Sequence, residues 1–289
     1  MKKIALAITN NLSPTKDFES IWFADRLRKA GAVVEELSWL DKSVNWADFD
    51  IVLVNNCFGY HNKIQQFSDW LEGLKRQKVK VLNSIDCINW NSNKFYLKDL
   101  EKKNFSILPT IWVEENAVID VALEVKARNW NKIIIKPTIS AGSSNTYVLS
   151  NDEIAKNGQN FLNAILQNCA AMIQEFKEIV VSKGEYSAIF FGKEFSHLVL
   201  KTPAAGDFRA GLNQGASVQA LDEFENKKIV AYAQNIVDAI DYDLLYARVD
   251  LIEVEGKIYI MEVELIEPLL YLQANENLAA NYVNKIINH

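Results

Sequence analysis

Two strand-like segments carry four charged residues at alternating positions. These residues are Arg248, Asp250, Glu262 and Glu264. The segments, 244–254 and 257–265, are rich in Val, Ile, Leu and Tyr, and Glu255-Gly256 separates them, which is typical of a β-hairpin. Because side chains alternate between the two faces of a strand, the arginine and the aspartate share one face, and the two glutamates share one face.

The length of the hairpin loop decides whether the two pairs lie on the same side. A two-residue loop would place Asp250 on the face opposite to the two glutamates. A three-residue loop, 254–256 with Gly256 in the left-handed conformation, brings all four residues together. Carboxylates on one face repel one another by about 0.2–1 kcal/mol per close cross-strand pair, and a hard cation such as Mg²⁺ would remove that cost. The alternative is an acidic face that is only solvated.

The composition is that of an ordinary globular protein with enough apolar residues for a large core. The chain has 289 residues, of which 49% are hydrophobic and 24% charged, and a net charge of -6. This charge argues against a nucleic-acid-binding surface. The apolar segment 4–8 is too short for a signal peptide, and no apolar run approaches the length of a membrane helix. The three cysteines, Cys57, Cys87 and Cys169, do not have the spacing of metal ligands. We therefore expect a cytoplasmic protein, one large domain or two to three small ones, without a membrane or nucleic-acid partner.

Residues 1–90 alternate between strand-like and helix-like segments. The predicted strands are 4–8, 33–37, 51–54 and 78–82, and the predicted helices are 18–29 and 64–74. This order favours a parallel sheet covered by helices, in which ligands bind beyond the carboxyl ends of the strands. Asn10, Asn55 and Asn56 lie at such ends, although turn formation explains each of them singly. The glycine fingerprint of a dinucleotide-binding domain is missing.

A loop of small residues, 138–146, follows a strand that ends at Lys136-Pro137. Backbone N–H groups in such a loop approach an anion closely, and the lysine adds a point charge for phosphate. We prefer phosphate binding over a flexible hairpin loop, although the P-loop pattern is absent. A predicted helix, 94–103, begins at Lys94, and a further strand ends at Phe176.

The last third contains a predicted hairpin and a glycine-punctuated loop. The hairpin strands are 184–191 and 194–201, with Glu185 and Lys201 at their ends and His197 as a structural residue. Segment 203–216 contains three glycines and Arg209, which could clamp a phosphate or carboxylate. We predict helices over 221–240, with Asp222 as its N-cap, and from about Asn275 onward.

Several short motifs follow one another in the order found in the ATP-grasp superfamily, which the chain resembles over nearly its whole length. They are Trp90-Asn91 with Lys94 and Tyr96-Leu97, Lys136-Pro137 with Ser140-Ala141-Gly142, Gln174-Glu175-Phe176, Phe195-Ser196-His197, Arg248 with Asp250, and the run 262–268. The combination is specific, although no single motif is. Within the superfamily the chain is most similar to ligases related to the cycloserine-biosynthesis enzyme and to bacterial glutathione synthetase.

The resemblance implies an α/β (α+β ATP-grasp) fold in three parts. Residues 1–90 would form a parallel-sheet domain that precedes the ATP-grasp fold. Residues 91–176 would form a linker helix and the small ATP-grasp subdomain, and residues 177–289 the large subdomain with the metal site. The two subdomains would clasp ATP between them.

The resemblance also implies a role for each matching residue. ATP would be bound by Lys94, Lys136, Ser140, Gly142, Ser143, Ser144, Glu175, Phe176 and Glu185. Phosphate or substrate carboxylate would face Lys201, Arg209 and Arg248. Mg²⁺, with Mn²⁺ as an alternative ion, would be bound by Asp250, Glu262 and Glu264. Many family members have Asn at the position of Glu264, which makes the charge of this site unusual.

The activity implied is an ATP-dependent, ADP-forming ligation of a carboxylate to an amine or thiol through an acyl phosphate. The partners would be small, amino-acid-like carboxylate and amine substrates, and the protein could be a homo-oligomer. Two alternatives keep the fold. One is a small-molecule kinase that stops at phosphorylation, and the other is a nucleotide-binding protein without catalysis.

Overall fold

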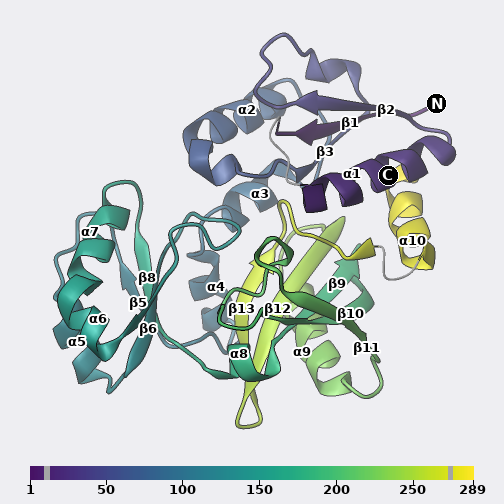
Figure 1. Cartoon of the computed structure of the whole chain (residues 1–289). Coiled ribbons are helices and arrows are strands. Elements are labelled where there is room, and N and C mark those ends of the chain that lie inside the picture. Colours follow the sequence, from purple (N-terminus) through teal and green to yellow (C-terminus); the bar gives the residue numbers. More distant parts are fainter. Residues whose placement is uncertain (10–13, 273–275) are drawn as a thin grey trace.

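The computed structural model describes residues 1–9, 14–272 and 276–289 (Figure 1). These residues form three separate sheets, which we use to name three units. No helix within the described ranges has the length and apolar character needed to span a membrane. The predicted α/β fold with an N-terminal parallel sheet is confirmed, because the first sheet is parallel and the other two are antiparallel.

The N-terminal unit is a parallel sheet with strand order β2-β1-β3-β4. Its strands are β1 (Lys3–Ile8), β2 (Val33–Ser38), β3 (Ile51–Asn56) and β4 (Val81–Leu82). Helices α1 (Pro14–Lys29) and α2 (Ile64–Arg76) cover opposite faces. The alternation of side chains along β1 explains this, since Ile4 and Leu6 lie in one core with α1 while Ala5 and Ala7 lie in another with α2.

The asparagines predicted at the carboxyl ends of these strands have different outcomes. Asn10 lies outside the described residues. Asn56 ends β3 and is buried, and its side-chain amide nitrogen has no hydrogen-bond partner among the described residues.

Two short helices, α3 (Ile85–Asn91) and α4 (Tyr96–Lys102), lead to the middle unit. Its sheet has strand order β5-β8-β6-β7. The strands are β5 (Thr110–Val113), β6 (Lys132–Pro137), β7 (Tyr147–Ser150) and β8 (Ala171–Glu175), and the helices are α5 (Val121–Ala127), α6 (Asn151–Glu153) and α7 (Gln159–Leu166). Asp120 caps α5 by accepting the backbone N–H of Leu123 at 3.0 Å. The helices gather on one side of this sheet (Figure 1), which leaves the other side to face the C-terminal unit.

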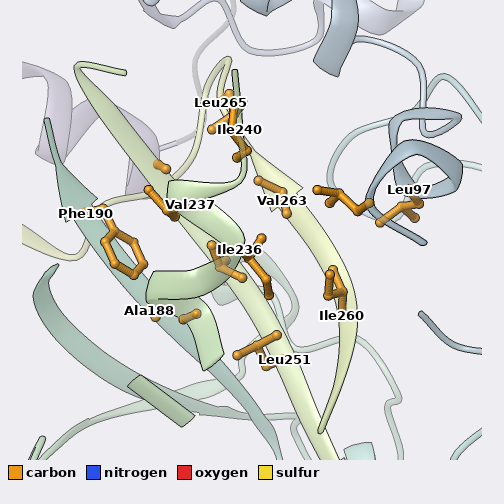
Figure 2. Close-up of a cluster of buried hydrophobic side chains, with 14 of the residues drawn as sticks. Leu97, Ala188, Phe190, Ile236, Val237, Ile240, Leu251, Ile260, Val263 and Leu265 are labelled. Carbon is orange, nitrogen blue, oxygen red and sulfur yellow. The ribbon is translucent and has the colours of Figure 1, made fainter. Parts of the chain in front are cut away.

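The C-terminal unit is an antiparallel sheet with strand order β11-β10-β9-β12-β13. Its strands are β9 (Glu185–Phe191), β10 (Glu194–Thr202), β11 (Ser217–Leu221), β12 (Tyr246–Val254) and β13 (Lys257–Glu264), and its helices are α8 (Ile179–Lys183) and α9 (Lys227–Asp238). Figure 2 shows how Ile236 and Val237 of α9 pack against Ala188, Leu251 and neighbouring apolar residues. The opposite face of β12 and β13 carries the charged residues.

The predicted helix over 221–240 is wrong in its first part. Residues 217–221 form an edge strand, which pairs with β10 through Lys201↔Val218 and its neighbours. Asp222 accepts the backbone N–H groups of Phe224 and Glu225 in a turn, and α9 begins only at Lys227. The physical reason is that an available edge of β10 satisfies the backbone of 217–221, an effect that helical periodicity does not include.

Helix α10 (Glu276–Ile287) returns to the N-terminal unit and lies beside α1 (Figure 1). The prediction started this helix at Asn275, which lies outside the described residues. The Tyr282 ring stacks on Phe23 of α1 and on Phe191 of β9, with centroid distances of 4.7 Å in both cases. One apolar core therefore joins the N-terminal unit, α10 and the C-terminal sheet.

Candidate active site

The β12–β13 hairpin brings the four charged residues of the first motif to one face. Its loop has two residues, Glu255 and Gly256, with φ angles of 51° and 80°. The three-residue loop is therefore wrong, yet its consequence holds. Asp250 pairs with Glu262 whereas Leu251 pairs with Ile260, so Met261 is an extra residue in β13. This β-bulge reverses the alternation of β13 and turns both glutamates to the side of Arg248 and Asp250.

Arg248 is the centre of this face. Its guanidinium contacts Asp250 at 2.9 Å and also forms an ion pair with Glu264, and its Nη1 donates to the Leu269 carbonyl at 3.2 Å. Both Arg248 and Asp250 are buried. A buried guanidinium is tolerated because its donors are satisfied by carboxylate and carbonyl oxygens.

Asp250 is held by two cations and a hydroxyl. Lys201 of β10 approaches it at 3.2 Å and also pairs with Glu185, while the Ser187 hydroxyl donates to it. Burial alone would raise the pKa of Asp250, but Arg248 and Lys201 together lower it below its ordinary value. Burial would in the same way lower the pKa of Lys201, which its two carboxylate neighbours raise above its ordinary value.

Lys94, just before α4, links the small-residue loop to the hairpin. Its Nζ donates to the Ser140 carbonyl at 2.7 Å and lies 3.0 Å from a carboxylate oxygen of Glu262. Its backbone N–H donates to the Thr138 carbonyl at 2.8 Å. Lys94 is buried, so these contacts form away from bulk water and fix the base of the loop against β13.

Lys136 enters the same region from β6. Burial lowers the pKa of Lys136, and the nearby charge of Lys94 lowers it further, while Glu262 and Glu185 oppose the shift. A buried lysine whose charged form is disfavoured by burial and by a second cation indicates a position where an anion would be stabilising.

A cleft between the middle and C-terminal sheets collects most of the residues predicted from the sequence. It is lined by Lys94, Lys136, Ser140, Gly142, Ser143, Glu175, Phe176, Glu185, Arg209 and Glu262. Ser144 lines a neighbouring pocket, toward His61 and α7. Glu264 lines a smaller adjoining cavity, which it shares with Glu262, Lys94 and Tyr60. Lys201, Arg248 and Asp250 lie on the same sheet face but not in the lining of the cleft.

Apolar residues that the sequence did not reveal form the walls of the cleft. They are Leu108, Ile134, Val180, Phe208 and Met261. The rings of Phe176 and Phe208 meet edge to face with centroids 6.4 Å apart. Such walls suit a flat aromatic group, and the charged residues at the other end suit an anion.

Arg209 lines the cleft but is held by a neighbour in its own loop. Its Nη2 lies 2.7 Å from Asp207, and its Nε donates to the same carboxylate at 3.0 Å. These hydrogen bonds hold the pKa of Asp207 well below its usual range. The guanidinium is therefore tied to the loop rather than to the charged face of the sheet.

The three carboxylates predicted to bind Mg²⁺ do not form a joint metal site in this arrangement. Among the described residues, no group of three or more His, Cys, Asp or Glu side chains could hold a metal ion. Each carboxylate instead pairs with a cation, Asp250 and Glu264 with Arg248 and Glu262 with Lys94. Asp250 is almost fully buried, whereas the side chains of Glu262 and Glu264 are 31% and 29% exposed. These two oxygen donors fit Mg²⁺, which leans on one or two carboxylates together with substrate phosphates.

Comparisons with known structures show that the fold is that of the ATP-grasp proteins. The crystal structure of D-cycloserine synthetase DcsG has a TM-score of 0.86 and 23% identity over 99% of both chains. D-alanine–D-alanine ligase from Bacillus anthracis complexed with ATP has a TM-score of 0.69 and 13% identity, with 99% of this chain and 95% of that chain covered. A RimK domain ATP-grasp protein from Sphaerobacter thermophilus has a TM-score of 0.68 and 10% identity over 99% of both chains.

The sequence comparisons point to the same relative. Residues 4–83 match the family described as D-cycloserine synthetase DcsG, N-terminal domain. The cycloserine biosynthesis protein DcsG of Streptomyces lavendulae is 23% identical over 305 residues, which cover 98% of this chain and 97% of that protein. The resemblance to the ATP-grasp superfamily and to DcsG is thus confirmed.

Proposed function

We propose that this protein is an ATP-grasp ligase that couples ATP cleavage to the joining of a carboxylate with an amine or thiol. The observation that carries this proposal is the convergence of lysines and carboxylates from two sheets at one cleft, beside a loop of small residues. We also propose the division into units at residues 90 and 176, with the nucleotide between the second and third. Its substrates would be small and amino-acid-like, as the name of the synthetase DcsG suggests.

The nucleotide would lie along the cleft in one direction. The base would contact Phe176 and Phe208, with Glu175 beside it and Glu185 near the ribose. The phosphates would reach Lys136 and Lys94, and the loop 140–145 would cover them with its backbone N–H groups. This orientation is supported because the apolar walls and the cationic end belong to one continuous lining.

Phosphoryl transfer would take place near Arg248 and Lys201. The substrate carboxylate would attack the terminal phosphorus, forming an acyl phosphate and releasing ADP. The cations would neutralise charge that develops on the transferring oxygens, which is the main contribution a protein makes to this step. Glu262 and Glu264, with Asp250 behind them, would hold Mg²⁺, which would supply positive charge that offsets the negative charge of the phosphates.

In the second step the amine or thiol would attack the acyl carbon and displace phosphate. No side-chain nucleophile is needed, because the acyl phosphate is already activated. What the site must supply is orientation and exclusion of water. We place this reaction in the cytoplasm, where ATP is available.

The test is a screen for ADP and phosphate release with pooled amino acids, amines and thiols in the presence of MgATP. Phosphate release that requires both a carboxylate and a second substrate supports the ligase. A stable phosphorylated product from one substrate alone would instead identify a small-molecule kinase. Binding of ATP without turnover of any pool would favour a nucleotide-binding protein without catalysis.

A further inference from the structure

Residues 268–272 form a strap that follows β13 and runs between the N-terminal unit and the charged face of the C-terminal sheet. Three side chains from three different elements bind its backbone. They are Glu19 of α1, His197 of β10 and Arg248 of β12. None of the motifs predicted from the sequence assigns a role to the strap or to Glu19.

Glu19 binds the strap with both of its carboxylate oxygens. One oxygen accepts the backbone N–H of Leu270 at 3.0 Å, and the other accepts that of Leu272 at 2.9 Å. Glu19 is 9% exposed, so these bonds replace the water that the carboxylate gives up. Buried N–H groups need such acceptors, and a residue that satisfies two of them at once fixes the path of the chain between them.

The residue between these two N–H groups has an unusual backbone. Tyr271 has a φ of +53°, the left-handed region that residues with a side chain seldom adopt. Such a conformation persists only where flanking interactions hold it. Glu19 supplies one flanking pair of bonds, and the His197 ring contributes another at 2.9 Å to the Leu270 carbonyl.

The strap in turn contacts Arg248 in two ways. The Leu269 carbonyl accepts a hydrogen bond from Arg248 Nη1 at 3.2 Å. The Tyr271 ring centroid lies 6.0 Å from the guanidinium carbon. Arg248 also donates to Asp250 and Glu264, so the strap adds a contact from outside the β12–β13 hairpin to those that orient the guanidinium.

We propose that Glu19 is a positioning residue for Arg248, acting through the strap from the N-terminal unit. The inference rests on the proposed function, in which Arg248 faces the transferring phosphate. A small displacement of a charge-stabilising group slows chemistry strongly while leaving distant nucleotide contacts unchanged. Glu19 should therefore influence the rate of turnover and not the affinity for ATP.

The central variant is Glu19→Gln, which keeps the size of the side chain. Its amide has one acceptor oxygen, so one strap N–H would face an NH₂ group instead of an acceptor. We expect kcat to fall about tenfold or more, with the Kd for ATP changed by less than about threefold. Glu36→Gln, in β2 of the same unit, is the control, because Glu36 makes a part-exposed contact with Arg28. Parent-like kcat in folded Glu19→Gln would overturn the proposal.

A double-variant cycle tests whether Glu19 acts through Arg248. If it does, adding Glu19→Gln to Arg248→Lys should cost little beyond the Arg248→Lys variant alone. Fully additive losses would show that the two residues act independently and would overturn the proposal. Glu19→Asp keeps both acceptor oxygens and should recover part of kcat, which also covers the case in which the glutamine variant folds poorly.

A readout without turnover separates this proposal from the proposed ligase activity. The Arg248 Nε–H signal in a ¹⁵N NMR spectrum, assigned with Arg248→Lys, should shift in Glu19→Gln and stay in place in Glu36→Gln. An unmoved signal in Glu19→Gln would overturn the positioning role whatever the activity. If the signal moves while no substrate pool gives turnover, the strap coupling stands and the ligase proposal fails.

Discussion

At the scale of single residues, Lys136 and Lys94 show how cations from different elements meet at the cleft. Lys136 reaches it from β6 and Lys94 from the segment before α4, and burial together with the charge of Lys94 lowers the pKa of Lys136. The nearby carboxylates of Glu262 and Glu185 oppose this shift in part, and a bound phosphate would oppose it further.

Lys136→Ala should weaken ATP binding without unfolding the protein. Loss of a charge-assisted contact costs about 1.5–3 kcal/mol, which corresponds to roughly tenfold to hundredfold in Kd. Calorimetric titration with a non-hydrolysable ATP analogue is the measurement. Lys126→Ala, at an exposed position of α5, is the matched control and should bind as the parent does. Equal affinity of both variants would remove Lys136 from the nucleotide site.

Glu264→Gln should reduce the stabilisation that MgATP confers. Burial raises the pKa of Glu264, and Arg248 opposes this shift while Glu262 and Asp250 add to it. The amide keeps the shape of the side chain, but its neutral oxygen binds a cation more weakly than a carboxylate does. A tenfold loss of affinity for MgATP would reduce the stabilisation by the ligand by about 1.4 kcal/mol. Thermal melts of parent and variant, with and without MgATP, supply the comparison. An undiminished shift would exclude Glu264 as a metal ligand.

The site residues that could be predicted from the sequence are charged residues within, or at the end of, an otherwise apolar strand. Lysine at a strand end and carboxylates within apolar strands stand out, which is why Lys136, Asp250 and Glu262 could be named. The apolar walls, such as Phe208 and Met261, have the same pattern as core residues and could not. Glu19 was missed because its partners, Leu270 and Leu272, lie 251 and 253 residues away, beyond the reach of any local spacing.

At the scale of elements, the loop 138–146 is anchored at its base and exposed at its tip. Lys94 binds Thr138 and Ser140, while Gly142 and Ser143 are exposed. With the loop in this position the cleft has a volume of about 120 Å³, smaller than the roughly 300 Å³ at which ligand pockets begin. We therefore expect the tip to lift when a nucleotide enters.

Amide exchange should show this division within the loop. In the absence of nucleotide, the amides of Gly142 and Ser143 should exchange quickly, and MgATP should slow them. Amides near Ser140 should change little, because Lys94 already fixes the loop base. Exchange that is equally slow at the tip with and without MgATP would mean a permanently closed loop. The exposed segment at Val118, which does not line the cleft, provides an internal reference.

His197, which binds the strap, should make the stability of the folded protein depend on pH. The Leu270 carbonyl can only accept, so Nε2 carries the hydrogen and Nδ1 accepts the Ser196 hydroxyl at 3.0 Å. Burial lowers the pKa of His197 from 6.5 to about 4, and the bond to Leu270 opposes the shift. Between these values the unfolded chain binds more protons, so acidification through this window should destabilise the folded protein.

His197→Gln keeps an N–H donor for the strap and does not titrate. Its free energy of unfolding should therefore depend less on pH between about 6.5 and about 4 than that of the parent. Urea unfolding at a series of pH values in this range is the measurement. Parallel curves for parent and variant would show that His197 titrates alike in the folded and unfolded states.

The strands and helices were largely predictable from the sequence, whereas the bulge in β13 and the edge strand β11 were not. The strands and helices of the N-terminal unit follow from period-two and helical patterns. The bulge at Met261 leaves no local signal, since Ile260, Met261 and Val263 are all apolar. The bulge is instead a consequence of packing across the hairpin, because Val263 must face α9 while Glu262 faces the cleft. The strand β11 was likewise missed because only the edge of β10 makes it form.

At the scale of the whole molecule, Tyr282 joins the N-terminal and C-terminal units. It is fully buried between Phe23 and Phe191, and its hydroxyl has no hydrogen-bond partner among the described residues. No periodicity identifies this role, because an amphipathic helix does not specify which surface will cover it. The partnership of α10 with α1 emerges only from the assembled fold.

Two substitutions at Tyr282 should act in different directions. Tyr282→Phe removes a buried, unsatisfied hydroxyl and keeps the ring, so stability should stay the same or rise by about 1 kcal/mol. Tyr282→Ala removes the ring from the shared core and should cost about 3–5 kcal/mol. Urea unfolding of both variants, followed by far-UV and near-UV signals, gives the comparison. A large loss in the phenylalanine variant would mean that the hydroxyl is bound in the folded protein.

The place of α10 in the sequence has a consequence for synthesis. The segment that forms the N-terminal sheet leaves the ribosome first, yet the cover of α1 includes Tyr282, Val283 and Ile286. At bacterial or eukaryotic rates of translation, about 200 further residues take roughly ten to forty seconds. During that time the apolar side of α1 has no native cover from α10. The nascent chain should consequently present a chaperone-binding surface near its beginning until its last helix emerges.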